Sequence, residues 1–472
     1  MRHAAWRYLC VTSALFLAAR TPSLEAQGTA RPSLHSVPPA GVSAFVDVSV
    51  VPMDRERVLS HQTVVVRGGR IETMGAAGTV SIPANAQRID GRGKYLMPGL
   101  VDMHAHFLGG TEDLGDAAGR QLALYLTAGF TTVRGLGGAP TALGLRDRIA
   151  AGSLLGPKLV VASPSINGQT ARTLGDVVRL VAEAKTAGFD LIKTHGGFPD
   201  VSFYDSLMVA AKRAGLPVSG HVTPEFGLRR AMAAGQQVEH LDGFIAEILR
   251  DGAPPPPPGQ VVADAGLLRM VDSVKLARLA ADMARTGIWN DPTLALFATV
   301  ASDETPAQMR MRPEMRYAPA ASLAQYEAQK APTLTALPSD GRRAFADTRK
   351  QIVRALHAAG AKLLIGSDSP QLFLLPGYAA LQEIDAFVDA GLSPYAALEA
   401  ATRNPAEYLG TSAEVGTVVP GKRADLILLE GNPLEQVSNL RRLAGVMLAG
   451  RWVDGASCDA LRSEIVARIA RN

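Results

Sequence analysis

Short apolar runs alternate with helical segments across the middle of this chain, and this alternation constrains the fold more than any other feature. Leu174 to Ala187 places apolar side chains at helical spacing, and Arg342 to Ala359 does likewise. Such an alternation is typical of an α/β domain with a parallel sheet. Eight strands close a (β/α)8 TIM barrel. The apolar runs that match this number lie near residues 99–104, 130–135, 157–163, 189–194, 216–221, 236–240, 286–293 and 361–367.

Both ends of the chain carry segments with the alternating pattern of β-strands. These segments lie at 44–50, 63–66, 70–74, 424–429, 443–448 and 450–453, and Gly68-Gly69 is the predicted turn of a hairpin. Strands from two ends that flank an α/β region predict one small β-sandwich domain built from both ends. The predicted divisions are a signal peptide at 1–26, the two parts of the β-sandwich at 27–97 and 413–472, and the barrel at 98–412.

Polar side chains stand at the ends of several of the apolar runs. Because the carboxyl ends of parallel strands share one rim of a barrel, we expect these side chains to converge. Imidazoles together with a carboxylate are typical of a divalent-metal site. The predicted site consists of His104, His106, Lys193, His221, His240 and Asp368.

The spacing of His104 and His106 supports this prediction. Side chains two residues apart on a strand project from the same face, so both imidazoles can reach one ion while Met103 and Ala105 point into packing. Taken alone, this short pattern is also compatible with two ordinary histidines at a strand end.

Three segments carry a resemblance to a known family. They are Met-Pro-Gly-Leu-Val-Asp-Met-His-Ala-His at 97–106, Gly-Phe-Thr-Thr-Val-Arg at 129–134, and the stretch from Gly-Thr-Val-Val-Pro-Gly-Lys-Arg-Ala-Asp to Gly-Asn-Pro-Leu at 416–434. Together they resemble the amidohydrolase superfamily, in its imidazolonepropionase-like and prolidase-like branch. Gly135 departs from the pattern, since that branch usually has Asp at this position.

The resemblance implies a binuclear metal centre. His104, His106 and Asp368 would hold one divalent ion, and His221 and His240 the second, with zinc as the expected metal. Lys193, carboxylated by carbon dioxide, would bridge the ions; the alternative is an ordinary lysine that reaches solvent. The ions lower the pKa of a shared water, so that a metal-activated hydroxide attacks the substrate. Asp368 would transfer its proton to the departing nitrogen; the alternative is a purely structural aspartate.

The resemblance favours an amide or dipeptide C–N bond in a small-molecule substrate. His195 lies two residues after Lys193 and is a candidate substrate contact, although a loop histidine with a backbone partner is an equal alternative. One rival function is a mononuclear deaminase or a cyclic-imide or lactone hydrolase of the same superfamily, in which Glu225 could shuttle protons. The other is a non-catalytic assembly protein, which normally would have lost ligands that this chain retains.

Two segments near the predicted rim interrupt the alternation. A run of five prolines at 254–258 is too stiff for a helix or a sheet strand, and a longer segment covers 301–340. Loops at this face of a barrel shape substrate choice, so both are predicted to form walls of the pocket. Surface decoration is the alternative for each.

Composition limits the class of protein. With 472 residues, 47% hydrophobic and 19% charged, the chain can bury a large core. The net charge is +4, but the basic residues are dispersed, so nucleic-acid binding is not expected. Cys458 would be the only cysteine of the mature chain, which excludes an intrachain disulfide. A homo-oligomer is compatible with this composition.

The N-terminus has the pattern of a secretory signal. Arg2 and Arg7 precede the apolar stretch from Tyr8 to Ala19, and a small residue, Ala26, precedes Gln27. The apolar stretch is well short of the roughly 20 residues that span a bilayer, so a membrane anchor is disfavoured. We therefore predict cleavage near Ala26 and a secreted or periplasmic enzyme without a membrane span.

Overall fold

The computed structural model describes residues 33–38, 40–107, 111, 113–257 and 259–471. The chain divides into two units, 1–31 and 32–472, and the account below concerns the second. The predicted signal peptide lies outside the described residues.

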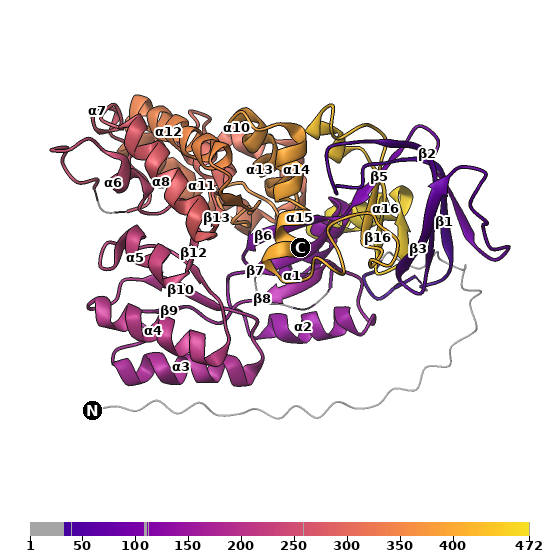
Figure 1. Ribbon diagram of the computed structural model, residues 1–472, viewed down its shortest axis with the longest axis horizontal. Coiled ribbons are helices and arrows are strands. Elements are labelled where there is room, and N and C mark those ends of the chain that lie inside the picture. Colours follow the sequence, from indigo (N-terminus) through magenta and orange to yellow (C-terminus); the bar gives the residue numbers. More distant parts are fainter. Residues whose placement is uncertain (1–32, 39, 108–110, 112, 258, 472) are drawn as a thin grey trace, which may run out of the picture. The chain divides into compact units, whose positions relative to one another are not determined.

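Parallel strands form the centre of the α/β domain (Figure 1). They make one sheet in the order β14-β13-β12-β11-β10-β9 and another in the order β6-β7-β8. The strands are β6 (Leu100–Ala105), β7 (Phe130–Gly135), β8 (Lys158–Val161), β9 (Ile166–Asn167), β10 (Ile192–Gly196), β11 (Val218–Gly220), β12 (Gln237–Glu239), β13 (Trp289–Asp291) and β14 (Lys362–Leu363).

Two isolated parallel bridges join these sheets. One pairs Ala162, after β8, with Leu191, before β10; the other pairs Ala105 of β6 with Ser369, after β14. On that second side the Met103 amide also donates to the Ile365 carbonyl at 2.8 Å. Parallel sheets joined on both sides make this a TIM-barrel-like domain.

Several strands are shorter than the sequence predicts. The run at 286–293 contributes only Trp289–Asp291, because the preceding helix continues to Thr286 and ends at Gly287, where φ is 67°. Glycine takes this left-handed conformation at little cost, so the helix can end immediately before the strand. The run at 361–367 forms ladder pairs only at Lys362–Leu363, although its later amides still bond to neighbouring segments.

Helices connect the strands, and both helices predicted from periodicity are present. The helix predicted at 174–187 is α3, whose Thr173 and Asp176 form a capping box. The helix predicted at 342–359 begins three residues earlier, as α12. The helices of the domain are α1 (Ala117–Thr127), α2 (Thr141–Ala150), α3 (Leu174–Ala187), α4 (Val201–Ala214), α5 (Gly227–Ala234), α6 (Phe244–Ile248), α7 (Ala265–Leu268), α8 (Ser273–Thr286), α9 (Leu294–Ala301), α12 (Ser339–Ala358), α13 (Tyr378–Asp389), α14 (Pro394–Ala400) and α15 (Arg403–Tyr408).

The segment predicted as a long wall at 301–340 is largely helical. It contains α10 (Pro306–Arg310), the 3-10 helix η1 (Pro313–Tyr317) and α11 (Ala320–Ala336) before α12 begins. Lys330 of α11 is fully buried, and its ammonium donates to the carbonyls of Thr299 and Ser302 at 2.8 and 2.6 Å. The segment is therefore anchored to the end of α9.

Strands from both ends of the chain share a third, eight-stranded sheet, where indigo and yellow strands meet in Figure 1. β15 joins the two ends by pairing with β5, with Ile427 opposite Met97. The predicted hairpin is present, with Gly68 and Gly69 at φ 57° and 79°. The β-sandwich itself stays a prediction. The strands are β1 (Ser43–Val50), β2 (Leu59–Arg67), β3 (Arg70–Ala76), β4 (Gln87–Asp90), β5 (Tyr95–Pro98), β15 (Leu426–Leu429), β16 (Leu443–Leu448) and β17 (Arg451–Asp454), and the 3-10 helix η2 (Val437–Arg441) lies between β15 and β16.

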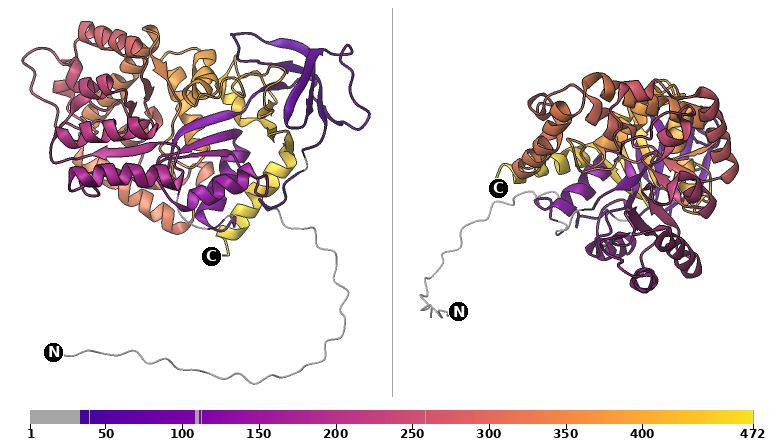
Figure 2. Two further views of the ribbon diagram at one scale, coloured as in Figure 1. Left: turned by 60° about the horizontal axis from the view of Figure 1, so that its bottom comes forward. Right: turned by 90° about the vertical axis from the view of Figure 1, so that its left-hand side faces the viewer.

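The C-terminal helix, α16 (Gly455–Ile469), packs beside α1, as the yellow and purple helices of Figure 2 show. Arg462 of α16 donates to the carbonyl of Thr127 at the end of α1, at 2.8 Å. Cys458 of the same helix is buried and forms no disulfide within the described residues. Among the described helices, none is both long and apolar enough to cross a membrane.

Candidate metal centre

The two histidines at the end of β6 face one aspartate. His106 Nε2 lies 2.6 Å from Asp368 Oδ1, and His104 Nε2 lies 3.3 Å from the same oxygen. Both imidazoles therefore project toward one point, as their two-residue spacing predicts. Within the described residues, His104, His106 and Asp368 form a group whose ligand atoms lie within 4.8 Å of one another, which suits a metal ion.

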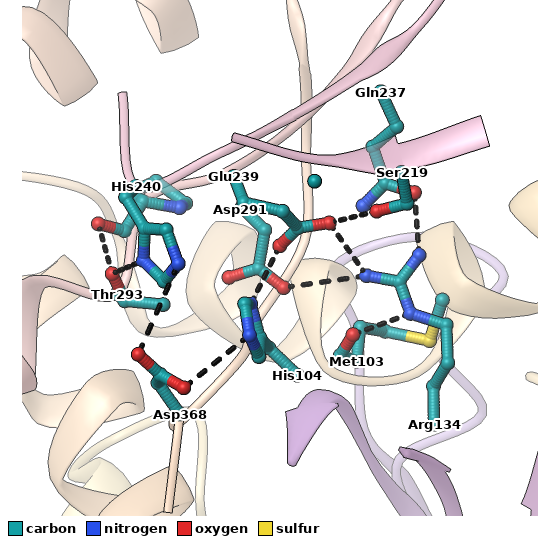
Figure 3. Close-up of polar contacts among 12 residues, drawn as sticks. Met103, His104, Arg134, Ser219, Gln237, Glu239, His240, Asp291, Thr293 and Asp368 are labelled. Atoms are coloured by element: carbon teal, nitrogen blue, oxygen red, sulfur yellow. Dashed lines mark hydrogen bonds and ion pairs between the residues drawn. The ribbon is translucent and has the colours of Figure 1, made fainter. Parts of the chain in front are cut away.

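Ring contacts extend this group through the other predicted histidines. The His240 ring centroid lies 4.7 Å from both the His104 and the His221 centroids, and the His195 ring stacks on His221 at 4.9 Å. His240 Nε2 also lies 3.9 Å from Asp368 Oδ2 (Figure 3). The structure thus brings together histidines at the ends of four strands, β6, β10, β11 and β12.

A polar oxygen holds the Nδ1 atom of three of these histidines. Glu239 lies 2.8 Å from His104 Nδ1 and Thr293 lies 2.8 Å from His240 Nδ1, and Asp242 lies 2.8 Å from His221 Nδ1. In metal sites, the ring nitrogen that does not bind the ion usually donates to such an oxygen, which fixes the ring. The second nitrogen, Nε2, is then free to bind a cation, and within the described part of the chain the Nε2 of buried His104 indeed has no hydrogen-bond partner.

Charge states at the centre suit a cation. Burial lowers the pKa values of His104 and His240 well below the usual range, so both rings are neutral at pH 7 and have a lone pair to offer. Burial tends to raise the pKa of Asp368, but His104, His106 and Lys193 outweigh it and lower this pKa, so the carboxylate is ionised. Burial lowers the pKa of His195 to about 3.

Lys193 lies on β10 and is only 1% exposed. Its Nζ atom has no hydrogen-bond partner among the residues that the structure describes, and burial lowers the pKa of the amine despite the nearby carboxylates of Glu239 and Asp368. The alternative of a lysine that reaches solvent is therefore wrong. An unpartnered buried amine with a lowered pKa is chemically suited to carboxylation or to a site filled by a further group.

The backbone is left-handed at three positions of the centre. His240, Thr293 and Asp368 have φ values of 60°, 48° and 53°. Side chains other than glycine rarely adopt this region, at a cost of about 1–3 kcal/mol each, and such residues cluster at functional sites. Arg349 holds this region, since its guanidinium donates to the carbonyls of His240 at 2.7 Å and Pro292 at 2.5 Å.

Two glutamines, one just after the first predicted wall and one within the second, contact residues of the centre or of the loop that follows Asp368. Gln260, which follows the proline run, places Nε2 3.1 Å from His221 Nδ1. Gln329 of α11 accepts from the Leu372 amide at 2.9 Å, four residues after Asp368. His195, the candidate substrate contact, has its Nδ1 2.6 Å from Ser165 Oγ. The role of these segments as pocket walls stays a prediction.

Sequence reasoning missed a buried polar cluster beside the centre. It lies within the strands, with Glu239 and Asp291 in contact range of His104, and it consists of Arg134, Ser219, Gln237, Glu239 and Asp291 (Figure 3). Polar residues inside otherwise apolar strands were the available signal, above all Glu239, which directly precedes His240. Gly135, the departure from the family pattern, lies next to this cluster, and a Cβ there would approach Phe107 Cδ2 to 3.0 Å.

Comparisons with known proteins agree with the resemblance seen in the sequence. The model of the amidohydrolase family matches residues 95–453. An adenine deaminase from Rubrobacter xylanophilus is 28% identical over 423 residues, 86% of this chain but only 57% of that protein. An imidazolonepropionase from the same organism is 25% identical over 393 residues, 79% of this chain and 85% of that enzyme.

Solved structures are also similar. A putative prolidase from Bifidobacterium longum has a TM-score of 0.64 and 26% identity, covering 90% of this chain and 99% of its own. Bottromycin amidohydrolase has a TM-score of 0.70 with 24% identity, and 91% of each chain is covered, so it bears on the fold alone. The chain therefore belongs to the amidohydrolase family. By that membership it is a hydrolase that acts on carbon–nitrogen bonds, which confirms the predicted enzyme class.

Proposed function

We propose that this protein is a binuclear metal-dependent hydrolase with two divalent ions, zinc being the expected metal. His104, His106 and Asp368 would hold the first ion. His221 and His240 would hold the second, and Lys193 as a carbamate would bridge the two. The observation that carries the proposal is the shared orientation of His104, His221 and His240, each held at Nδ1 by an oxygen so that Nε2 remains to bind an ion.

The donor set fits such ions. Neutral imidazoles and an ionised carboxylate are the ligand types that zinc prefers, and they are already oriented by neighbouring oxygens. The unpartnered buried Nζ of Lys193 fits the carbamate, because an anionic group there would replace an unsatisfied amine and face cations. Bound ions would polarise the scissile carbonyl and lower the pKa of an attacking water.

Asp368 would act as the proton-transfer group. Burial raises the pKa of its carboxyl, but the hydrogen bond with His106 and the nearby Lys193 help to outweigh burial and lower this pKa, so the group is ionised at neutral pH and can accept a proton. Its backbone carbonyl accepts from the side chain of Gln371 at 2.7 Å, which helps to hold the loop in place. From this position it would pass the proton to the departing nitrogen of the substrate. His195, neutral at pH 7, would contact the substrate through hydrogen bonding.

For the substrate we propose a small amide or dipeptide with a cleavable C–N bond. The similarity to a putative prolidase supports this class. A mononuclear deaminase is the second candidate, supported by the 28% identity to an adenine deaminase. Its proposed proton shuttle, Glu225, already accepts from Thr223 Oγ1 at 2.6 Å and the Phe198 amide at 3.0 Å, so the carboxylate is engaged by its own loop and by the loop after β10. A cyclic-imide or lactone hydrolase would leave the same ligands in place.

Metal content and a substrate screen together test this proposal. The purified protein, loaded with zinc and bicarbonate, is analysed for metal by mass spectrometry and assayed with N-acyl amino acids, dipeptides, lactones, cyclic imides and adenine. About two ions per chain with turnover of a dipeptide or N-acyl amino acid supports the binuclear amidohydrolase. One ion with turnover of adenine or a cyclic imide supports the rival.

Two structural proposals accompany the function. The bridges Ala105–Ser369 and Ala162–Leu191 support closure of the parallel strands into a (β/α)8 barrel, with the sheet shared by both chain ends as part of a β-sandwich. We also propose export to the periplasm or the exterior, which the charged and apolar pattern of residues 2–19 supports.

A further inference from the structure

A cluster of fully buried polar side chains lies directly behind His104. We call Arg134, Ser219, Gln237 and Glu239 the Arg134 cluster; the side chains of Arg134 and Glu239 are 0% exposed. Burying a guanidinium and a carboxylate is costly unless the geometry of the pair is favourable and the remaining hydrogen bonds are satisfied. The hydrogen bonds of Arg134 and Glu239 therefore indicate which neighbouring groups this buried pair positions.

Arg134 ties together two strands that carry predicted ligands. Its Nε donates to the carbonyl of Met103, the residue before His104, at 2.5 Å. Its two terminal nitrogens donate to Gln237 Oε1 at 2.5 Å and to Glu239 Oε1 at 3.0 Å (Figure 3). One guanidinium thus links β6 with β12, and the planar fork fixes both in one relative position.

Glu239 connects Arg134 to His104 and orients the imidazole of His104. Its Oε1 accepts from Arg134 and from the hydroxyl of Ser219, and its Oε2 lies 2.8 Å from His104 Nδ1. An ionised carboxylate only accepts hydrogen bonds, so Nδ1 carries the proton and donates it. This leaves the lone pair of His104 on Nε2, the atom that faces Asp368 and has no hydrogen-bond partner in the described ranges.

We propose that Arg134 and Glu239 are positioning residues that set the affinity of the site formed by His104, His106 and Asp368. They do so by fixing the tautomer and the ring orientation of His104. This inference rests on the proposed metal function. Loss of an outer partner of a metal-binding histidine typically costs 10–100-fold in metal affinity, so the affinity of this one site should fall by about that factor.

The test measures metal binding rather than turnover. Zn2+ affinities of the full chain are obtained by competition with a chromophoric chelator, and the visible spectrum of the Co2+ form reports the coordination of the first site. Glu239→Gln keeps the size of the side chain but places an amide against Arg134 and Ser219. We expect it to weaken one of the two Zn2+ affinities about 10–100-fold and to change the Co2+ spectrum, with the other affinity within about threefold of wild type.

Arg134→Lys and Arg342→Met complete the design. Arg134→Lys keeps the positive charge but loses the planar guanidinium that donates to several acceptors at once, so we expect an intermediate loss of Zn2+ affinity. Arg342 is a matched control, since it is 2% exposed and pairs with Asp303 and the carbonyl of Leu337 on a different part of the domain. Arg342→Met should lower the melting temperature and leave both Zn2+ affinities unchanged. Ser219→Ala, which removes one hydrogen bond to Glu239, is the milder variant if Glu239→Gln does not fold.

His104→Ala separates the outcomes. If His104→Ala loses one ion while folded Glu239→Gln and Ser219→Ala bind both ions with wild-type affinity, the positioning role is overturned and the proposed metal function stands. If His104→Ala itself keeps both ions at wild-type affinity, the proposed metal site is wrong. An equal loss of affinity in Arg342→Met would also overturn the inference, because the effect would then follow from reduced stability alone.

Discussion

Replacement of Lys193 by methionine should change the stability of the protein in opposite directions in the absence and presence of metal. Without metal, the side chain is buried and its Nζ has no hydrogen-bond partner among the described residues, and the lowered pKa shows that burial outweighs the attraction of Glu239 and Asp368. A buried polar group without a partner costs about 1–3 kcal/mol. Methionine has a similar length, is apolar and adapts to irregular space. Lys193→Met should therefore stabilise the metal-free protein by about 1–3 kcal/mol.

In the presence of metal, Lys193→Met should instead lower the stability of the folded protein. A ligand at 1,000 times its dissociation constant stabilises the folded state by about 4.1 kcal/mol per site, which exceeds the gain of about 1–3 kcal/mol expected in the metal-free protein. Methionine cannot be carboxylated, so the variant should lose the bridge and one ion, and with it a stabilisation of about this size. Unfolding by urea is measured with a chelator present and again with Zn2+ and bicarbonate, and the bound zinc is counted by mass spectrometry.

Lys330→Met is the matched control. Lys330 is buried like Lys193, but its ammonium donates to three backbone carbonyls, including that of Val300 at 3.2 Å. This control should be destabilised both with and without metal.

In addition, acetate or propionate should partly restore metal and activity to Lys193→Ala, but not to Lys193→Arg, whose guanidinium keeps its charge and fills the gap. Two zinc ions and an unchanged rate in Lys193→Met would refute the bridging role and favour the mononuclear rival.

Three further predictions concern other parts of the chain. His104→Ala should lose much of the bound metal and nearly all activity while circular dichroism shows a retained fold; unchanged metal content and turnover would contradict the site. Expression in a bacterium should yield a mature N-terminus near Gln27 outside the cytoplasm, by mass spectrometry, and an intact Met1 on a cytoplasmic product would contradict export. Burial raises the pKa of Glu383 to about 7 from 4.5, so the folded state retains a proton that the unfolded state releases, and stability should fall as pH rises from about 4.5 to about 7. Relative to Glu383→Gln, the metal-free wild type should lose roughly 3 kcal/mol over this window in urea unfolding, and a difference that does not change with pH would show that the shift is absent.

The sequence by itself determined the α/β class, the approximate positions of most central strands and the two periodic helices, but not the short strand β9. These are local properties, because the spacing of apolar side chains along a strand or a helix can be read from neighbouring residues. The resemblance at 97–106 and 416–434 also identified the superfamily, which the family match confirms. The predicted ligands could also be named from the local pattern, because each lies at the end of an apolar run. Their metal-binding role stays a prediction.

Only the tertiary structure decided which atoms meet. His104 and Glu239 are 135 positions apart, and His106 and Asp368 are 262 apart, so their pairing depends on strand register and on how the two parallel sheets join. The length of β13 was likewise decided by where α8 ends at Gly287, against an apolar run that continues on both sides. Local patterns specify which face of a strand a side chain occupies. The distances between side chains on different strands depend on strand register and long-range packing, which no local pattern contains.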